Sequence, residues 1–586
     1  MGLSVILLAA CAEPEEVRLI AVEGCGLDQE FSGLRIRVLG DFAPGVGQEL
    51  VLAPGESGSL TELRADAVGV AAEGLFGTTV TAVGRSYGVD ASLAGGRLGS
   101  TPALAVYFAA PDRACAVAGA PAGRFALAGA ESQRGEVLLV GGRSQSGAAL
   151  DALIHVDLLT GEARALETRL EQSLVGASVV AIGPRRFALI GGARAGAVFS
   201  TWIPVTLTGA GDGLDAIVEE PQPLVAMGVP VAMHEHAFAR SPVDGAVLLA
   251  GGCTTVTADD RCVVGSAENQ VHWLRSSTEE PGFELEQAPG LARRRFAAAG
   301  VIDGSGVAYV AGGFDESGAA VAEVERLLPG KSWEVVHTLA GGERVSGAAV
   351  LDGELLVLAT IEGTVHWWSP VGAGILEAGS RAPTLDVAPE GRALAMLSGE
   401  RVLADGWIFA PGSAAVDPAG ELRALDTGDR SGALLLPVVD GTVVIAGGVD
   451  AASLPVEPTL LRLRPALDGP DEWIPELTGN AADAFVTNAP GEPRWSWAGC
   501  TSMGSIRASR RCRWCRPMSG AFAARRCASS SRSRSTTARG RGWCSVTVAS
   551  WSPSRWAGRP SCVGARPMAR RPRWAVPWRR RRGTRR

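Results

Sequence analysis

The stretch Val137-Leu138-Leu139-Val140-Gly141-Gly142 decides the fold, because the same pattern of four apolar residues and two glycines returns along the chain. A pattern that recurs about every fifty residues predicts a repeat architecture. The further clear copies are Phe187-Ala188-Leu189-Ile190-Gly191-Gly192, Val247-Leu248-Leu249-Ala250-Gly251-Gly252, Ala308-Tyr309-Val310-Ala311-Gly312-Gly313 and Val443-Val444-Ile445-Ala446-Gly447-Gly448.

Each copy describes a buried strand. Four consecutive apolar residues without alternation predict a strand that is covered on both faces, as in stacked sheets. The two glycines let the backbone pass where a side chain would collide with the next sheet, or they allow a positive φ. A unit of roughly fifty residues holds four short strands and their loops, which is one blade of a β-propeller.

A turn residue six positions before the first glycine sets the register of the repeat, and Asp244-Gly245 and Asp440-Gly441 are typical hairpin dipeptides. In two units the glycine pair has decayed, to Ala359-Thr360 and Leu397-Ser398. The register predicts seven units, anchored at Gly135, Arg185, Gly245, Gly306, Gly353, Gly391 and Gly441.

These units resemble kelch repeats, in which an apolar run and Gly-Gly precede an aromatic residue or an aspartate and then a tryptophan. The residues that carry the resemblance are Val156-Asp157-Leu158 with Thr160-Gly161, then Trp333 and Trp473, and His236 and Arg295 match the family's His or Arg before the turn. Several later Tyr and Trp positions are missing. The resemblance implies a seven-bladed kelch-like β-propeller over residues 118–490.

The segment before the repeats lacks the glycine pair. Its runs Val17–Val22, Leu34–Leu39, Thr78–Val83 and Ala103–Phe108 favour strands, and the second and third alternate as half-buried strands do. We expect a small antiparallel β-sandwich-like domain over residues 12–117, which makes the whole chain all-β.

The N-terminus resembles a bacterial lipoprotein signal over residues 1–11, since an apolar run ends in Leu8-Ala9-Ala10-Cys11. The resemblance implies export, lipidation of Cys11 and attachment to the outer membrane or cell surface through the lipid alone. No Lys or Arg precedes the apolar run, in contrast to ordinary export signals. The alternative is a buried apolar strand of a cytosolic protein.

Export predicts paired cysteines. Cys253 with Cys262 would close a small loop directly after a glycine pair, and Cys25 with Cys115 would bracket the first domain. Free buried thiols are the alternative.

His234-Glu235-His236 is the densest cluster of metal-ligand residue types, because residues two apart on a strand share a face. A hydrogen-bonding role for His236 between strands is the favoured interpretation, so no metal is predicted. The chain has three tyrosines, Tyr87, Tyr107 and Tyr309, too few for the copper site of kelch-like oxidases, and it has no sialidase boxes. No catalytic or cofactor-binding residue is predicted.

The loops after the glycine pairs remain as candidate binding elements. They include Arg143–Gly147, Ala193–Gly196, Phe314–Gly318 and Val449-Asp450, and equivalent loops of a propeller gather on one rim. We therefore expect a non-catalytic binding scaffold of the cell envelope with a protein or glycan partner. The alternative is an envelope carbohydrate-active enzyme that uses the central opening.

Charge divides the chain. Residues 493–586 contain 24 Arg and no Asp, Glu or Lys, which leaves 31 basic against 62 acidic residues in the body. An acidic body argues against nucleic acid as a partner. Residues 491–586, which also hold six of the eleven Cys, are expected to be disordered or to result from a frameshift.

Overall fold

The computed structural model describes residues 15–466 with gaps, and Cys544–Val548 beyond them. The gaps are 28–30, 41–48, 55, 57, 61–66, 87–96, 99–100, 133–134, 277–282, 340–341, 352–354, 372–373, 382–387, 389–390, 398–400, 405, 411–420, 429 and 439. The protein is all-β in these residues, apart from short 3₁₀ segments at Gly211–Gly213 and at Gly342. Cys11 and nearly all of the Arg-rich tail lie outside the described residues.

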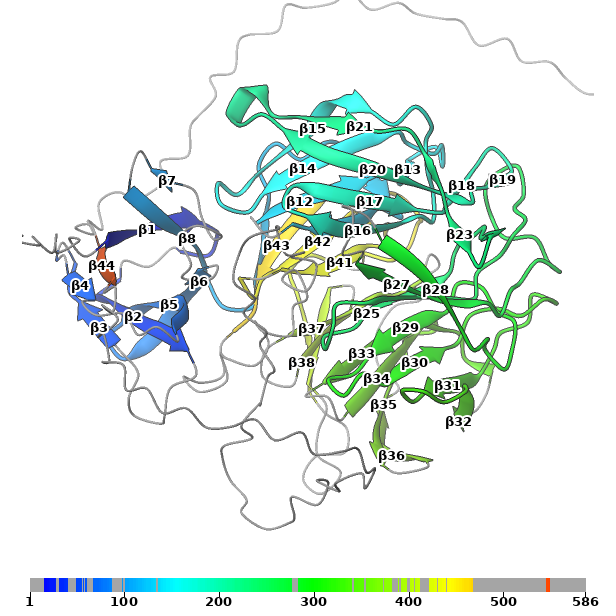
Figure 1. The fold of residues 1–586 in the computed structure, drawn as a ribbon. Helices are drawn as coiled ribbons and strands as arrows, with labels where there is room; N and C mark the ends of the chain where they lie inside the picture. The colour runs from blue at the N-terminus through cyan, green and yellow to red at the C-terminus, as the bar shows by residue number, and fades with distance from the viewer. Residues whose placement is uncertain are drawn as a thin grey trace, which may run out of the picture.

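Seven antiparallel sheets, six of four strands and one of five, follow one another along the repeat region, coloured from cyan to yellow in Figure 1. The first four are β11 (Ala128–Glu131), β12 (Glu136–Val140), β14 (Ala152–Asp157) and β15 (Glu162–Arg169); β16 (Ser178–Gly183), β17 (Arg186–Ile190), β20 (Thr201–Thr208) and β21 (Asp215–Val218), with β22 (Gln222–Pro223) beside β20; β25 (Ala237–Arg240), β26 (Val247–Ala250), β27 (Val271–Ser276) and β28 (Phe283–Ala288); and β29 (Ala299–Ile302), β30 (Ala308–Ala311), β31 (Glu323–Leu327) and β32 (Glu334–Thr338).

The last three sheets have the same strand order. They are β33 (Val345–Leu351), β34 (Leu355–Thr360), β35 (Val365–Val371) and β36 (Gly374–Arg381); β37 (Leu394–Leu397), β38 (Arg401–Ala404), β39 (Trp407–Ala410) and β40 (Glu421–Ala424); and β41 (Leu434–Pro437), β42 (Val443–Ala446), β43 (Leu460–Arg464) and β9 (Arg113–Ala116). Three two-stranded ribbons complete the region: β10 (Arg124–Phe125) with β13 (Arg143–Ser144), β18 (Ala193–Arg194) with β19 (Ala197–Val198), and β23 (Val225–Ala226) with β24 (Val229–Pro230).

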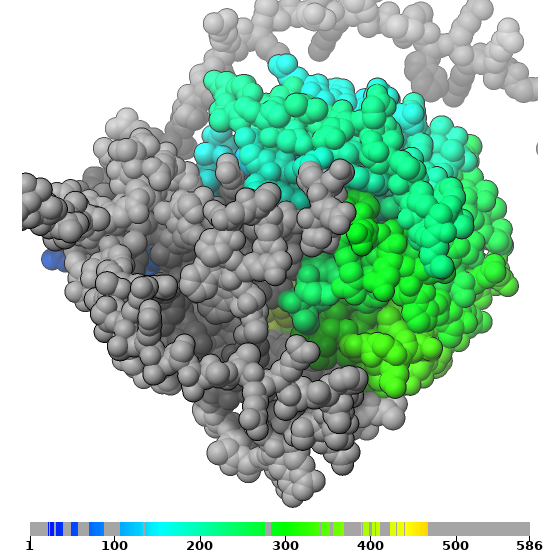
Figure 2. All heavy atoms as spheres, viewed as in Figure 1, coloured from blue at the N-terminus to red at the C-terminus, as the bar shows by residue number. Residues whose placement is uncertain are grey.

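The apolar runs form the second strand of their sheets, and each strand is covered on both faces. Val137 and Leu139 of β12 pack in one core cluster with β42, whereas Leu138 and Val140 pack in another with β17. Because successive side chains of a strand point to opposite faces, four apolar residues in a row supply both layers. The space-filling view shows the sheets from cyan to green as one continuous mass (Figure 2).

The glycine pairs meet the backbone of the next sheet. A Cβ on Gly141, Gly191, Gly251 or Gly312 would lie 2.4–2.5 Å from the carbonyl oxygen of a residue that precedes or begins the first strand of the following sheet. All ten paired glycines also have positive φ. Both predicted reasons for the glycines therefore hold in the structure.

The first strand of a sheet contacts the first strand of a neighbouring sheet, and β41 of the seventh sheet contacts β11 of the first. A Cβ on Gly447 of the seventh sheet would lie 2.4 Å from the carbonyl oxygen of Arg124, just before the first sheet. This contact repeats the one that Gly141, Gly191, Gly251 and Gly312 make with the segment at the start of the sheet that follows each of them.

Two details of the predicted register are wrong. Gly391 does not form a hairpin turn: it lies before β37, and Leu397 ends that first strand instead of preceding a glycine pair. The strand β9 falls on the N-terminal side of the expected boundary at residues 117 and 118, yet it is the fourth strand of the seventh sheet. Its sequence Arg-Ala-Cys-Ala carries no apolar run that would mark it as part of a repeat.

The N-terminal segment, in blue at the left of Figure 1, forms a nine-stranded sheet together with β44 of the tail, which is drawn in orange. Its order is β3 (Glu49–Leu52), β2 (Gly33–Gly40), β5 (Ala67–Phe76), β6 (Thr79–Ser86), β8 (Thr101–Ala109), β1 (Glu15–Glu23), β44 (Cys544–Val548) and β4 (Gly58–Leu60), with β7 (Arg97–Leu98) beside β8. The sheet is not purely antiparallel as expected, because β1 runs parallel to both β8 and β44. Alternation in a sequence places side chains on faces but does not specify strand direction.

A buried charged network joins this sheet to the repeat region. Asp440 accepts hydrogen bonds from Arg462 Nη2 at 2.6 Å and Arg464 Nη2 at 2.9 Å, and Arg464 also donates to the carbonyl oxygen of Tyr107 in β8. Burial would raise the pKa of Asp440, but the charges of Arg462 and Arg464 and hydrogen bonds from Thr442 outweigh burial and hold that pKa below its usual range.

One disulfide and two ion pairs reinforce the same junction. A disulfide joins Cys25, just after β1, to Cys115 in β9. Asp112 accepts hydrogen bonds from Arg401 Nη1 at 3.0 Å and Arg423 Nη1 at 2.9 Å, both of the sixth sheet. The segment that leaves the N-terminal sheet is thus fixed to the last two sheets of the repeat region.

Candidate functional site

The segments after the glycine pairs gather at one end of the sheets. A second strand runs antiparallel to its first strand, so it ends where the first strand begins. In each clear unit the residue after the glycine pair is bridged to a residue that precedes the first strand, and we call this end of the molecule the loop face. The bridges are Phe125 with Arg143, Val175 with Ala193, His234 with Cys253, Phe296 with Phe314, and Ser431 with Val449.

Several polar residues that the sequence offered as binding candidates shape their own turns instead. Asp315 Oδ1 accepts hydrogen bonds from the backbone N–H groups of Ser317 and Ala319, at 2.8 and 3.1 Å. Asp450 Oδ1 does the same for the residues two and four positions later, each at 2.9 Å. These carboxylates hold the loops in shape, as aspartate does in turns.

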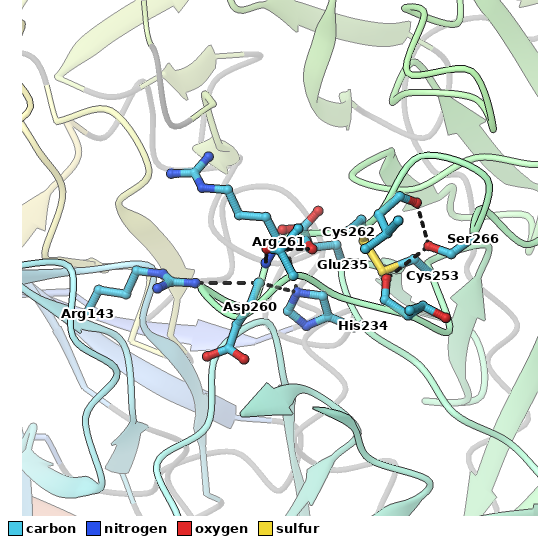
Figure 3. Close-up of a disulfide and its surroundings, with 11 residues drawn as sticks. Arg143, His234, Glu235, Cys253, Asp260, Arg261, Cys262 and Ser266 are labelled. Atoms are coloured by element: carbon cyan, nitrogen blue, oxygen red, sulfur yellow. Dashed lines mark hydrogen bonds and ion pairs between the residues drawn. A yellow bond between two sulfur atoms is a disulfide. The ribbon is translucent and has the colours of Figure 1, made fainter. Parts of the chain in front are cut away.

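One long loop of the third sheet fastens the loop face together. It begins at Cys253, which forms a disulfide with Cys262, the pair favoured from the sequence. Within it, Asp260 Oδ1 accepts a hydrogen bond from Gly196 N of the second sheet at 3.0 Å. Arg143 Nη2 of the first sheet donates to the carbonyl oxygen of Asp259 at 2.8 Å (Figure 3).

The same loop also reaches the fourth sheet, because Gly265 N donates to the carbonyl oxygen of Glu316 at 2.7 Å. Four consecutive sheets are therefore connected through the residues from Cys253 to Gly265. The exposed side chains of this loop, among them Thr254, Ala258 and Asp259, stand on a support that is closed by a disulfide. A rigid support that displays exposed side chains is the usual arrangement of a binding loop.

The two candidate histidines are buried and engaged. His234 is fully buried, and its Nε2 lies 3.0 Å from the carbonyl oxygen of Asp260 (Figure 3). His236 Nε2 lies 2.9 Å from Ser178 Oγ of the second sheet, which is the inter-strand role expected from the sequence. Burial, together with the neighbouring His234, lowers the pKa of His236 to about 4.

Among the described residues, one group has metal-ligand spacing: ligand atoms of His234, Glu235 and Cys262 lie within 4.8 Å of one another. The Cys262 sulfur is committed to the disulfide with Cys253, so it offers no thiolate. His234 Nε2 already faces the Asp260 carbonyl. The donor set that remains does not fit a zinc or copper site.

His236 and Arg295 are not equivalent, contrary to the sequence-based assignment. Gly252 N donates to the carbonyl oxygen of Arg295, and Gly192 N donates in the same way to that of Met233. Met233 is therefore the counterpart of Arg295, and His236 matches Ala298. The two residue types looked alike because both lie shortly before a first strand.

Left-handed residues border the loop face near the first strands. We call six of them, from six sheets, the collar: Ala126, Gly176, Glu235, Ala297, Gly391 and Gly432. Backbone hydrogen bonds link them between sheets, from Ala297 N to Glu235 O, from Ala126 N to Gly432 O and from Gly432 N to Gly391 O. Glu235 is the member with an ionisable side chain.

Glu235 was not singled out from the sequence as a binding residue by itself, because His234 and His236 on either side of it suggested a metal site. Alignment of the five segments before the first strands would have found it: Ala126, Gly176, Ala297 and Gly432 occupy the same register. A glutamate among Ala and Gly in a left-handed conformation is the exception in this series.

No known protein family matches the chain, and no curated protein matches it. Among solved structures, the chain is similar to the protein in "Structure of YjhT", with 14% identity and a TM-score of 0.36 over 60% of this chain and 97% of that one. It is also similar to a chain in "Cryo-EM structure of RAG in complex with one melted RSS and one unmelted RSS", with 12% identity and a TM-score of 0.34 over 60% of this chain and 99% of that one.

Within the described part of the chain, no helix has the length and apolar character needed to cross a membrane.

Proposed function

We propose that the seven sheets are the blades of a closed, kelch-like β-propeller. The contact of Gly447 with Arg124 supports closure, since it repeats between the seventh and first sheets the packing that each earlier glycine pair makes. The seventh blade takes its outer strand from β9, near the start of the chain. Pairing of a strand from the start of the repeat region with the last blade supports a closed ring, because it holds the two ends of the repeat region together.

The propeller is a non-catalytic binding scaffold of the bacterial cell envelope, held to the membrane by a lipid on Cys11. The observation that carries the proposal is the loop face: a disulfide-closed loop joined by hydrogen bonds to Arg143, Gly196 and Glu316 of three other sheets. Such cross-linking fixes exposed residues before any partner arrives, which lowers the entropic cost of binding. The bound partner is a protein or glycan of the envelope.

A capture experiment with the full chain tests this proposal. The protein is immobilised and exposed to envelope proteins and to a glycan array, alongside two variants at exposed positions. The first variant is Ala258→Glu, at a residue on the loop face. The second is Val243→Glu, at a residue in the turn between β25 and β26 at the opposite end of the sheets. Retention of a ligand by wild type and Val243→Glu, with loss by Ala258→Glu, supports a loop-face scaffold; turnover of any captured glycan contradicts a non-catalytic role.

Attachment through Cys11 has its own test. Mass spectrometry of protein isolated from membranes is expected to find a lipidated Cys11 as the first residue, and Cys11→Ser is expected to release the protein from the membrane fraction. Unmodified protein that begins at Met1 would contradict this part of the proposal.

A further inference from the structure

The collar offers a ligand one carboxylate, that of Glu235, and its Oε1 lies 3.6 Å from Nε2 of the buried His234. Its other members are Ala126, Gly176, Ala297, Gly391 and Gly432, whose side chains are a methyl group or a hydrogen atom. The side chain of Glu235 is 31% exposed. A group that approaches the collar from the loop face thus meets the Glu235 carboxylate as the one ionisable collar side chain.

Glu235 keeps its position at a conformational cost. Its φ is +49°, in the left-handed region where a side chain is disfavoured and glycine is not. The backbone does not need glutamate there, since Ala297 and Gly432 adopt the same conformation. A strained residue whose side chain is not required by the fold is a candidate for function.

The collar is poor in donors and rich in acceptors. The N–H groups of Ala126, Ala297 and Gly432 are used in hydrogen bonds between sheets. The carbonyl oxygens of Glu235 and Gly432 each accept one of these bonds and keep a second lone pair, whereas the carbonyl oxygen of Gly391 also accepts from Ser431 Oγ. Hydroxyl groups of a glycan need both donors and acceptors, whereas a cationic side chain needs acceptors alone, so the collar suits a cation.

Two aromatic rings lie beside the collar. Phe296, which directly precedes Ala297, packs against Phe314 with ring centroids 5.6 Å apart, and both residues are partly exposed. Aromatic rings favour the methylene stem and the charge of lysine or arginine. The body of the chain also carries 31 more acidic than basic residues, which attracts cations at long range.

We propose that Glu235 recognises a lysine or arginine side chain of a protein partner, inserted into the collar from the loop face. The proposal rests on the binding scaffold proposed above and names the chemistry of its partner. A metal ion is a poorer occupant, since His234 Nε2 faces the carbonyl of Asp260 and Cys262 is in a disulfide.

Saturation-transfer NMR with the full chain tests the proposal. The probes are two seven-residue peptides of glycine and serine that differ at the central position, lysine in one and glutamine in the other. Wild type is expected to transfer at least about five times more saturation to the lysine peptide, and Glu235→Gln is expected to abolish the difference. Equal transfer to both peptides by wild type, or a lysine preference that survives Glu235→Gln, would overturn the proposal.

Two control variants separate the collar from general electrostatics and from folding. Glu171→Gln removes the same charge from an exposed position of the loop face, between β15 and β16, and is expected to keep the lysine preference. Glu235→Gly removes the carboxylate together with its strain, so it is expected to lose the preference while its melting temperature stays at or above that of wild type. Loss of the preference in Glu171→Gln would contradict the assignment to Glu235.

Failure of the proposed lysine or arginine recognition by Glu235 can be distinguished from failure of the proposed binding scaffold. An envelope partner that requires the loop face but binds Glu235→Gln as well as wild type would remove the role of Glu235 and leave the scaffold standing. A glycan that binds wild type and is lost in Glu235→Gln would overturn the cationic ligand.

Discussion

The guanidinium of Arg295 is fully buried and donates a hydrogen bond from Nη1 to the carbonyl oxygen of Gly312, 17 residues later, at 3.1 Å. Arg430 makes the same contact with Gly447, also 17 residues later, at 3.3 Å. The carbonyl oxygen of Arg295 in turn accepts from Gly252 N of the previous sheet. One arginine thus connects the glycine pairs of two consecutive sheets.

Replacement of Arg295 by methionine is expected to lower the free energy of unfolding by about 3–5 kcal/mol, because it leaves the buried Glu325 carboxylate without its ion-pair partner. Urea unfolding followed by circular dichroism measures this. The double variant Arg295→Met/Glu325→Leu is expected to recover much of the loss. A cost below about 1 kcal/mol for Arg295→Met would show that Glu325 finds another partner.

The packing role of the glycine pairs can be tested by comparing a paired glycine with a glycine that has free space around it. Gly251→Ala places a Cβ 2.5 Å from the Arg295 carbonyl oxygen at a φ of +66°, whereas Gly147→Ala has a φ of +78° but nothing within 4 Å. Gly147→Ala is expected to cost about 1 kcal/mol from conformation alone. Gly251→Ala is expected to cost at least about twice as much, since backbone must also shift. Equal melting temperatures for the two variants would contradict the packing role.

Acid is expected to destabilise the protein through His236. The pKa of His236 is lowered to about 4 in the folded state, but unfolded histidine takes up its proton near pH 6.5. Between these values the unfolded state binds more protons, so stability is full above about pH 6.5 and falls by up to about 1.4 kcal/mol per pH unit as the pH drops toward 4. Urea unfolding between pH 7.5 and 4.5 measures the slope, and His236→Gln should flatten it. An unchanged slope in His236→Gln would assign the effect to other groups.

The two disulfides should differ in their contribution. Cys25 and Cys115 are 90 residues apart, and Cys253 and Cys262 are 9 apart. Loop-closure entropy predicts a loss of about 5 kcal/mol for Cys25→Ala/Cys115→Ala and about 3 kcal/mol for Cys253→Ala/Cys262→Ala. Chemical unfolding without reductant compares the two double variants. The opposite order would mean that contacts of the short loop, such as Arg143 with Asp259, dominate over chain entropy.

Asp440 is expected to hold the N-terminal sheet against the repeat region. Asp440→Asn removes the charge that faces Arg462 and Arg464 and should cost about 3–5 kcal/mol. Limited proteolysis should then cleave the segment between β8 and β9 faster than in wild type. Unchanged proteolysis would assign the junction to the Cys25–Cys115 disulfide alone.

The apolar runs could be predicted because burial on two faces leaves a plain signature. Val247–Ala250 and Val443–Ala446 form strands β26 and β42, and their glycine pairs have the positive φ that their sequence suggests. This signature marks five of the seven sheets, and the other two were added from the turn register, in which the anchor Gly391 was wrong. The all-β class therefore rests on local sequence.

Other features depend on contacts that the local sequence does not encode. Gly391 was wrongly assigned to a hairpin turn, because glycine is favoured at a left-handed position both in the collar and in a turn. The strand β9 was missed because its pairing with β43 joins residues more than 300 positions apart. Asp260 has no sequence signal for its contacts with Gly196 and His234, which arise when the loop packs on its neighbours.

The position of β9 has a consequence for how the protein is made. The residues of β9, Arg113–Ala116, are synthesised before all other strands of the seven sheets. The partner strand β43 ends only at Arg464. The edge of β9 stays unpaired while the ribosome adds more than 300 residues, and an unpaired strand edge favours aggregation. The seventh sheet cannot be completed before Arg464 has been made, and a nascent chain that stops short of it is left with an open edge at each end.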